Sequence, residues 1–170
     1  MKNNSSIKTV VAVGIGAALF FVLGRFVAIP SPVPNTNISL QYAVLALLAA
    51  MYGPVAGGLI GFIGHTLIDL SWGGSPWWSW VIASAFVGVV VGLFAKKLDL
   101  QEGEFGKKKM AAFTAANVVA HLLAWIVVAP VLDILIYAEP AKKVFAQGAF
   151  AAVSNIITAV VVGGLLVLAY

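Results

Sequence analysis

The sequence predicts an all-α membrane protein with six transmembrane helices in a single domain, residues 1–170, and with both termini on the inner side of the membrane. Three observations lead to this fold class. Of the 170 residues, 62% are hydrophobic and 9% are charged. The mean hydropathy is +1.04, and a soluble domain, nearer a quarter charged, could not bury this much apolar surface. Finally, only Arg25 and Asp69 interrupt the long apolar stretches.

This composition excludes several classes of protein. A cytosolic enzyme, a disordered tail and a nucleic-acid-binding protein all require a larger share of polar and charged residues. The sequence contains no cysteine, which rules out disulfides, thiolate metal sites and cysteine nucleophiles.

The first predicted helix covers residues 7–29 and ends at the proline-rich residues 30–34. It is too long for a cleavable signal peptide, and no small-x-small cleavage site follows it. Residues 40–70 then form a stretch of 31 positions, about 46 Å as one helix, which exceeds a single crossing. Because Gly53-Pro54 breaks this stretch, we predict two short helices at residues 38–52 and 54–70.

Three further apolar segments complete the set of six, and basic residues set their orientation. These helices are predicted at residues 77–95, 110–131 and 145–170.

The distribution of basic residues predicts the orientation of the helices. With the N-terminus inside, seven lysines lie on the inner side, and only Arg25, Lys142 and Lys143 lie outside. This excess favours N-in and C-in. The inner lysines are Lys2, Lys8, Lys96, Lys97, Lys107, Lys108 and Lys109. Residues 96–109 are interpreted as a solvated connector.

Two helices carry small residues at helical spacing, which lets another helix approach closely in lipid. In the first helix the pairs are Ala12 with Gly16, and Gly14 with Ala18. They suit either packing within the bundle or docking of a partner. In the third helix the small residues are Gly57, Gly58, Gly61 and Gly64, for which we predict internal packing.

The outer side of the predicted bundle is rich in tryptophan and amide side chains. Trp72, Trp77, Trp78 and Trp80 follow the third helix, and Asn35 and Asn37 lie in the loop after the first. An aromatic belt at the membrane interface is one explanation. The other is a pocket with aromatic walls and a few polar groups for an organic ligand.

Polar residues at spacing four lie within two of the helices. His65 and Asp69 share one face of the third helix, and Arg25 is close enough in depth to pair with Asp69 or to contact a ligand. In the fifth helix, Asn117 and His121 share a face that continues to Trp125. A metal site is disfavoured because no third ligand has suitable spacing.

Recognisable catalytic and nucleotide-binding motifs are absent from the sequence. It contains no Gly-x-Ser-x-Gly, no His-Glu-x-x-His and no P-loop. We therefore expect no catalytic residue and no cofactor of the chain's own. If the protein moves a solute uphill, another subunit must supply the energy.

Three segments carry a resemblance to a known family: residues 14–25 (GIGAALFFVLGR), 34–39 (PNTNIS) and 64–80 (GHTLIDLSWGGSPWWSW). Together with six helices of this length, they resemble the S components of energy-coupling-factor (ECF) transporters over the whole chain. The resemblance is closest to a subgroup that includes a cobalamin-specific member from lactobacilli. The family's docking motif is alanine-x-x-x-alanine, matched here by Gly14-x-x-x-Ala18 or by Ala12-x-x-x-Gly16.

The resemblance implies a multi-pass protein of the bacterial plasma membrane that captures a vitamin from outside, with cobalamin the first candidate. It implies docking onto a membrane-embedded T component with two ATPase subunits that use the ATP, and toppling of the S component during transport. The pocket would open outward among loops and helix ends. Its expected residues are Asn35, Asn37, Asp69, Trp72, Trp77, Trp78, Trp80 and Tyr137, with His65, His121 and Gln147 as a deeper group.

Three alternatives remain open at this point. The ligand could be another B vitamin or its precursor, because a pyrimidine or riboflavin would also stack on tryptophan. The chain could instead be a membrane-embedded enzyme acting on lipid or isoprenoid groups through His65, Asp69 or His121. It could also be a scaffold of packed helices.

Overall fold

The computed structural model describes residues 2–100 and 105–170, and side chains from residue 6 onward. The side chain of Lys2 and residues 101–104 of the predicted connector lie outside this description. The elements in chain order are α1 (Lys2–Phe26), β1 (Ile29–Pro30), β2 (Asn37–Ile38), α2 (Gln41–Tyr52), α3 (Pro54–Ser71), α4 (Trp78–Leu93), α5 (Ala95–Leu98), α6 (Lys107–Leu122), the π-helix η1 (Leu123–Val128), α7 (Ala129–Tyr137), α8 (Ala141–Ile157), the π-helix η2 (Thr158–Val162) and α9 (Gly163–Ala169).

Within the described residues, the longer helices form six rods, because α6, η1 and α7 are continuous, as are α8, η2 and α9. Four rods are long and apolar enough to cross a membrane: Ser6–Phe26, Pro54–Ser71, Lys107–Tyr137 and Ala141–Ala169. Helices α2 and α4 are apolar but shorter. The structure thus agrees with an all-α membrane protein, while six crossings and the N-in orientation stay predictions.

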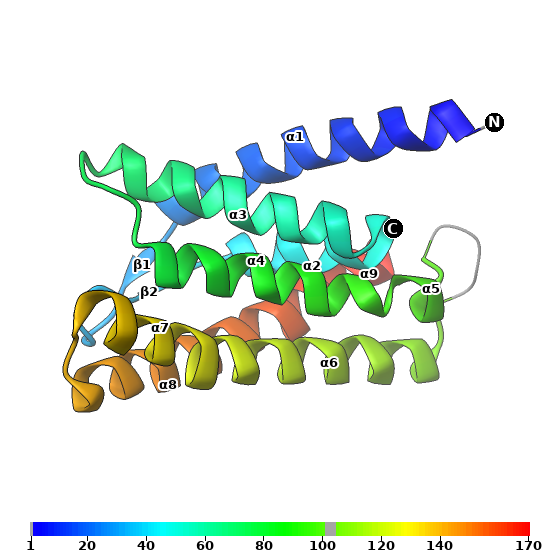
Figure 1. Ribbon diagram of the computed structural model, residues 1–170. Coiled ribbons are helices and arrows are strands. Elements are labelled where there is room, and N and C mark those ends of the chain that lie inside the picture. The colour runs from blue at the N-terminus through cyan, green and yellow to red at the C-terminus, as the bar shows by residue number, and fades with distance from the viewer. Residues whose placement is uncertain (1, 101–104) are drawn as a thin grey trace.

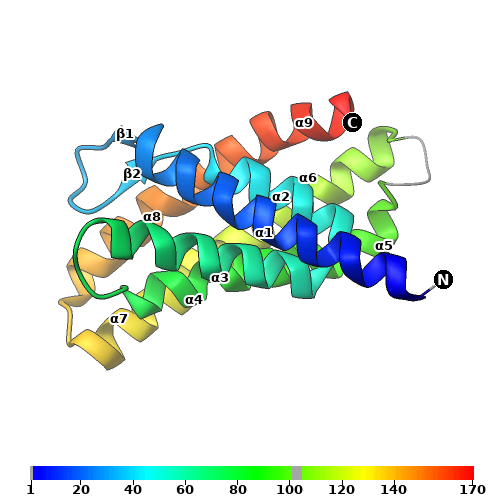
Figure 2. The same cartoon turned by 90° about the horizontal axis from the view of Figure 1, so that it is seen from above.

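The two ends of the bundle differ in what they contain. Both termini and α5 lie at one end, and the β1–β2 hairpin, the α3–α4 loop and the α7–α8 turn lie at the other (Figures 1 and 2). In the hairpin, Ile29 pairs with Ile38 and Pro30 with Asn37 in antiparallel register. We call the hairpin end of the molecule the loop end and the other the terminal end.

Helices α3 and α4 pack closely through facing glycines. A Cβ atom on Gly57 would meet the backbone carbonyl of Gly88, and one on Gly61 would meet that of Ser84. Small residues are what allow two backbones to approach this closely. The predicted internal packing of the third helix is therefore confirmed.

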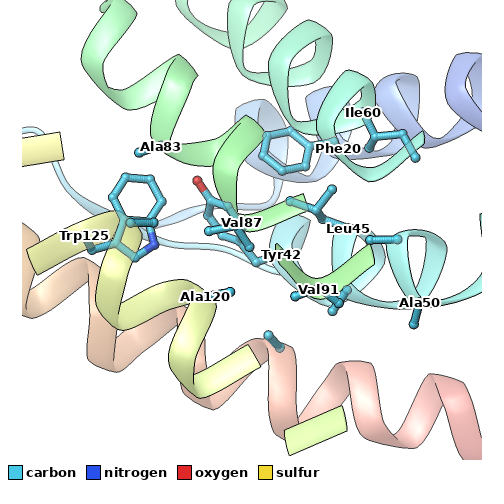
Figure 3. Packing of buried hydrophobic residues seen from close by; sticks show 14 of the residues in the cluster. Phe20, Tyr42, Leu45, Ala50, Ile60, Ala83, Val87, Val91, Ala120 and Trp125 are labelled. Atoms are coloured by element: carbon cyan, nitrogen blue, oxygen red, sulfur yellow. The ribbon is translucent and has the colours of Figure 1, made fainter. Parts of the chain in front are cut away.

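The core is a band of apolar side chains between the rods. Tyr42 from α2 lies between Phe20 and Trp125, and Leu45 and Val87 continue the packing (Figure 3). The Phe20 and Tyr42 rings meet edge to face with centroids 5.3 Å apart, and the Tyr42 and Trp125 rings do so at 5.7 Å. These aromatic contacts form the layer directly beneath the loop end.

Several helix ends differ from the sequence expectations. Ile29 and Ile38, predicted to lie in the first two helices, lie in strands β1 and β2. The sequence predicts that the fifth helix ends at residue 131, but this helix runs on to Tyr137. Pro130 lies in the first turn of α7, directly after the π-helical turns of η1, so the helix continues despite its missing N–H. As a result Asp133, expected in a polar loop, lies in α7 with 2% of its surface exposed.

Candidate functional site

The loop end of the bundle contains a cavity of about 900 Å³. Its wall is built by the hairpin loop, the last turns of α3, the first turns of α4, and residues of α7 and α8. The volume lies near the upper end of the range of about 300–1,000 Å³ found for ligand pockets. The cavity is therefore large enough for a sizeable organic molecule.

The floor of the cavity is a hydrogen-bonded group of side chains from α2, α3 and α4. The hydroxyl groups of Tyr42 and Ser84 lie 2.7 Å apart, and His65 Nδ1 lies 2.6 Å from Ser84 Oγ. On the other side of the imidazole, His65 Nε2 lies 3.7 Å from Asp69 Oδ1. Tyr42, His65 and Asp69 line the cavity, whereas Ser84 lies behind them with 0% of its surface exposed.

This Asp–His–Ser order is not the arrangement of an activated nucleophile. The Asp69–His65 separation of 3.7 Å exceeds a hydrogen bond, and the buried Ser84 hydroxyl is shared with Tyr42. The group instead fixes the shape and polarity of the floor.

One wall of the cavity depends on Trp77, which two carboxylates hold from different helices. Its backbone N–H donates to Asp69 Oδ2 at 2.8 Å, and its indole N–H donates to Asp133 Oδ1 at 2.6 Å. The indole N–H of Trp80 donates to the other oxygen of Asp133 at 3.0 Å, and Ser79 Oγ also donates to this carboxylate. Asp133 thus accepts three hydrogen bonds, two at Oδ1 and one at Oδ2.

Tyr137 and Trp78 support this wall from outside the cavity. The Tyr137 ring stacks on Trp77 with centroids 4.0 Å apart, and its hydroxyl accepts a hydrogen bond from the backbone N–H of Trp78 at 2.9 Å. The Trp78 ring stacks on Phe62, and Trp78 as a whole is 42% exposed. Asp133 and Tyr137 are one helical turn apart, so a single face of α7 fixes the start of α4.

The hairpin loop forms the opposite wall. Thr36 Oγ1 donates to the carbonyl of Val33 at 2.6 Å, and Gln147 Nε2 donates to the carbonyl of Pro34 at 2.8 Å. The second bond ties the loop to α8 across 113 positions of the chain. Asn35 takes a left-handed conformation with φ of 57°, which asparagine tolerates better than most residues.

The structure brings together most of the residues expected at the site. The lining includes Asn35, Asn37, His65, Asp69, Trp72, Trp77, Trp80 and Gln147. Trp78, Tyr137 and His121 are not part of it. Arg25 forms no ion pair with Asp69; its guanidinium group lies over the ring of Trp72, 3.7 Å from the centroid.

His121 lies deeper in the bundle, fully buried. Its Nδ1 accepts a hydrogen bond from Trp125 Nε1 at 3.0 Å, and its ring packs edge to face on Tyr42. Two polar atoms of this region, His121 Nε2 and Asn117 Oδ1, have no hydrogen-bond partner. His121 therefore lies beneath the cavity floor, where it contacts Tyr42 and Trp125.

Several lining residues were absent from the expected set. Asp133 lies beyond the predicted end of the fifth helix at residue 131, so the sequence places it with the charges of the following loop. Gln41 and Tyr42 lie directly after the asparagine-rich loop, and their closeness to this loop is the sequence feature that could have placed them in the cavity lining. The remaining residues lie in a region without a sequence motif: Lys143 and Asn155 belong to α8, and Glu139 belongs to the turn before it. These additional lining residues are Gln41, Tyr42, Asp133, Glu139, Lys143 and Asn155.

The two small-residue pairs of α1 have different surroundings. Ala12 and Gly16 are buried, and a Cβ on Gly16 would lie 2.7 Å from side-chain atoms of Leu48 and Ile60. Gly14 and Ala18 are exposed, and a Cβ on Gly14 would meet nothing within 4 Å. Only the second pair therefore leaves a free surface for another helix.

Comparisons with known proteins cover nearly the whole chain. Residues 4–170 match the family described as "ECF-type riboflavin transporter, S component". The chain is 52% identical over 170 residues to a UPF0397 protein of Enterococcus faecalis, covering 100% of this chain and 93% of that protein. It is 56% identical over 168 residues to one of Exiguobacterium, covering 99% and 92%.

A solved structure shares the fold. The S-component for biotin from an ECF-type ABC transporter superposes with a TM-score of 0.66 at 19% sequence identity, covering 98% of this chain and 94% of that one. At this identity the likeness concerns the fold and not the ligand.

Proposed function

The chain belongs to the family of ECF-type riboflavin transporter S components, and from this premise we propose that it is the substrate-capture subunit of an ATP-driven importer of a vitamin. The family is one of membrane-embedded transport subunits and not of enzymes. The observation that carries the proposal is the cavity of about 900 Å³ at the loop end, with its tryptophan wall and polar floor.

The basic residues support a proposal for the direction in which the cavity opens. Lys8, Lys96 and Lys97 lie at the terminal end, opposite the cavity, together with the start of α6. If this end is cytoplasmic, as the excess of lysine favours, the cavity faces the outside. A ligand would then be captured from the medium.

A corrinoid is our first candidate ligand, and riboflavin is the second. A cavity near the upper end of the usual volume range favours a large ligand. Flat rings would lie against Trp77 and Trp80, and peripheral amides would bond to side chains such as Asn35 and Gln41. Riboflavin, which the family description names, would also stack on tryptophan and would fill less of the space.

We propose that Gly14 and Ala18 form the docking surface for the T component. Their exposure on α1 gives a helix of that subunit room to approach closely, whereas Ala12 and Gly16 already pack against this chain. Two ATPase subunits attached to the T component would supply the energy, because this sequence has no nucleotide-binding motif.

Vitamin uptake by reconstituted vesicles tests this function. The chain is reconstituted into vesicles with its T component and ATPases, and ATP is supplied on the side of the membrane where the ATPases lie. The accumulation of labelled cobalamin and labelled riboflavin is then measured. We expect uptake of one vitamin that requires both ATP and this chain. Equal uptake by vesicles that lack this chain would contradict the proposal.

A further inference from the structure

The charges that line the cavity are unequal in sign. Among the described lining residues, the acidic side chains are Asp69, Asp133 and Glu139, and the basic one besides His65 is Lys143. Lys143 Nζ lies 2.7 Å from Glu139 Oε2, so these two charges balance each other. Two carboxylates, Asp69 and Asp133, remain.

Among the described residues, no lysine or arginine forms an ion pair with either of these carboxylates. Asp133 is held by neutral donors, the indole N–H groups of Trp77 and Trp80 and the hydroxyl of Ser79. Asp69 accepts the backbone N–H of Trp77, and His65 lies 3.7 Å from its other oxygen. These donors satisfy hydrogen bonds but leave the negative charges uncancelled.

The two charges lie on either side of one tryptophan. Because Asp69 and Asp133 both bond to Trp77, a ligand stacked on this wall would lie close to both carboxylates. The site is embedded in a bundle of apolar helices, where charges are screened less than in bulk water. A negative group on the ligand would therefore be strongly disfavoured.

Arg25 lies close to the cavity but forms no ion pair with either carboxylate. Arg25 is not among the lining residues, and its guanidinium group lies against the ring of Trp72. Asp69 also remains partly open, with 19% of its side chain exposed, so a ligand can reach it.

We propose that the cavity selects a ligand that is uncharged or cationic, with an N–H or O–H donor directed to Asp69, and that it rejects ligands with a net negative charge such as free carboxylates and phosphate monoesters. This inference rests on the proposed function, because it names the chemical class of the vitamin that the same cavity takes. Biotin, which carries a free carboxylate, is thereby excluded, although a biotin S component shares this fold.

Matched ligand pairs that differ in charge test this selectivity. The pairs are riboflavin and its 5′-phosphate, thiamine and its monophosphate, cyanocobalamin and its monocarboxylic acid, and biotinamide and biotin. Equilibrium binding of each is measured by calorimetry on the purified full-length chain. For any pair that binds, the anionic member should bind at least about tenfold more weakly, because its negative charge is repelled by Asp69 and Asp133.

Substitutions then assign the selectivity to the named charges. Asp69→Asn keeps an oxygen for the Trp77 N–H but removes the charge, so the affinity gap within a pair should shrink. Lys143→Gln removes the cation that pairs with Glu139, so the affinity gap within a ligand pair should widen. Asp99→Asn, the same charge change at an exposed position at the terminal end, should leave it unchanged.

The outcomes separate the two proposals. If an anionic member binds as tightly as its partner, or if Asp69→Asn leaves the gap intact, the inference about charge is wrong while the proposed capture of a vitamin stands. If no member of any pair and no other B vitamin binds, both are overturned, whereas binding of another vitamin with a net negative charge overturns the inference about charge alone.

Discussion

The indole N–H of Trp77 donates to Oδ1 of Asp133 at 2.6 Å, a contact between residues 56 positions apart in the chain. It joins the start of α4 to α7 and, together with the bond from Trp80, fixes two rings of the cavity wall. Asp133 is the residue on which the shape of that wall most depends.

Replacing Asp133 with leucine should destabilise the protein and disorder the wall. Three donors would lose their acceptor, of which the Ser79 hydroxyl is fully buried, and a buried unsatisfied group costs about 1–3 kcal/mol. We expect a clear drop in the thermal unfolding temperature in detergent and a loss of near-ultraviolet circular dichroism from tryptophan. Asp133→Asn, which keeps one acceptor oxygen, should lie between leucine and the wild type. An unchanged tryptophan signal in Asp133→Leu would show that this carboxylate does not position the rings.

The exposed pair on α1 should be needed for transport but not for binding. Gly14→Trp and Ala18→Trp should abolish uptake in reconstituted vesicles while leaving the ligand Kd of the isolated chain unchanged, because a large ring blocks the close approach of another helix. Val153→Trp, at a position of α8 that is 62% exposed, is the matched control and should leave uptake intact. Loss of binding in either α1 variant would place that residue in the fold or the pocket.

Alanine at Gly88 should weaken the contact between α3 and α4. The added methyl group would meet the backbone carbonyl of Gly57, and backbone cannot move aside as a flexible side chain can. We expect a loss of about 1–3 kcal/mol in stability, the usual cost of overpacking, measured by thermal unfolding. Gly74→Ala is the control, since a Cβ there meets nothing within 4 Å. Equal stability of the two variants would contradict the close packing.

His121 should matter for stability more than for ligand affinity. His121→Phe removes the acceptor of the Trp125 indole N–H, and leaving that donor unpaired costs about 1–3 kcal/mol. Because His121 does not line the cavity, the Kd of the ligand should change little, whereas His65→Phe, which alters the floor, should weaken binding strongly. A large loss of affinity in His121→Phe without a loss of stability would place His121 in contact with the ligand.

The helical segments could be predicted because apolar length and loop charge are properties of the sequence alone. The end of the fifth helix is the exception: it is predicted at residue 131, but α7 contains both Pro130 and Asp133 and ends at Tyr137. The structure shows why a charge is tolerated there, since Trp77, Ser79 and Trp80 supply donors from α4. Such compensation between distant segments leaves no local pattern in the sequence.

The candidate site could be predicted in outline because several of its residues are neighbours in the sequence. Trp77, Trp80 and Asp69 lie close together in the chain, and their clustering indicated a ligand pocket. His121 looked equivalent to His65 in sequence, since each is part of a polar pair at spacing four, but α6 and α3 present them at different depths. Only the packing of the rods distinguishes the histidine at the cavity from the one beneath it.

Equilibrium binding of a vitamin panel to the purified chain tests the central claim most directly. Because a ligand that binds the folded state raises its stability by an amount set by the ratio of concentration to Kd, a thermal-shift series can screen all B vitamins and corrinoids. We predict that one vitamin without net negative charge binds saturably, and that its binding weakens in Trp77→Ala and Asp69→Ala. A panel in which no vitamin shifts the unfolding temperature or binds in calorimetry would contradict the account.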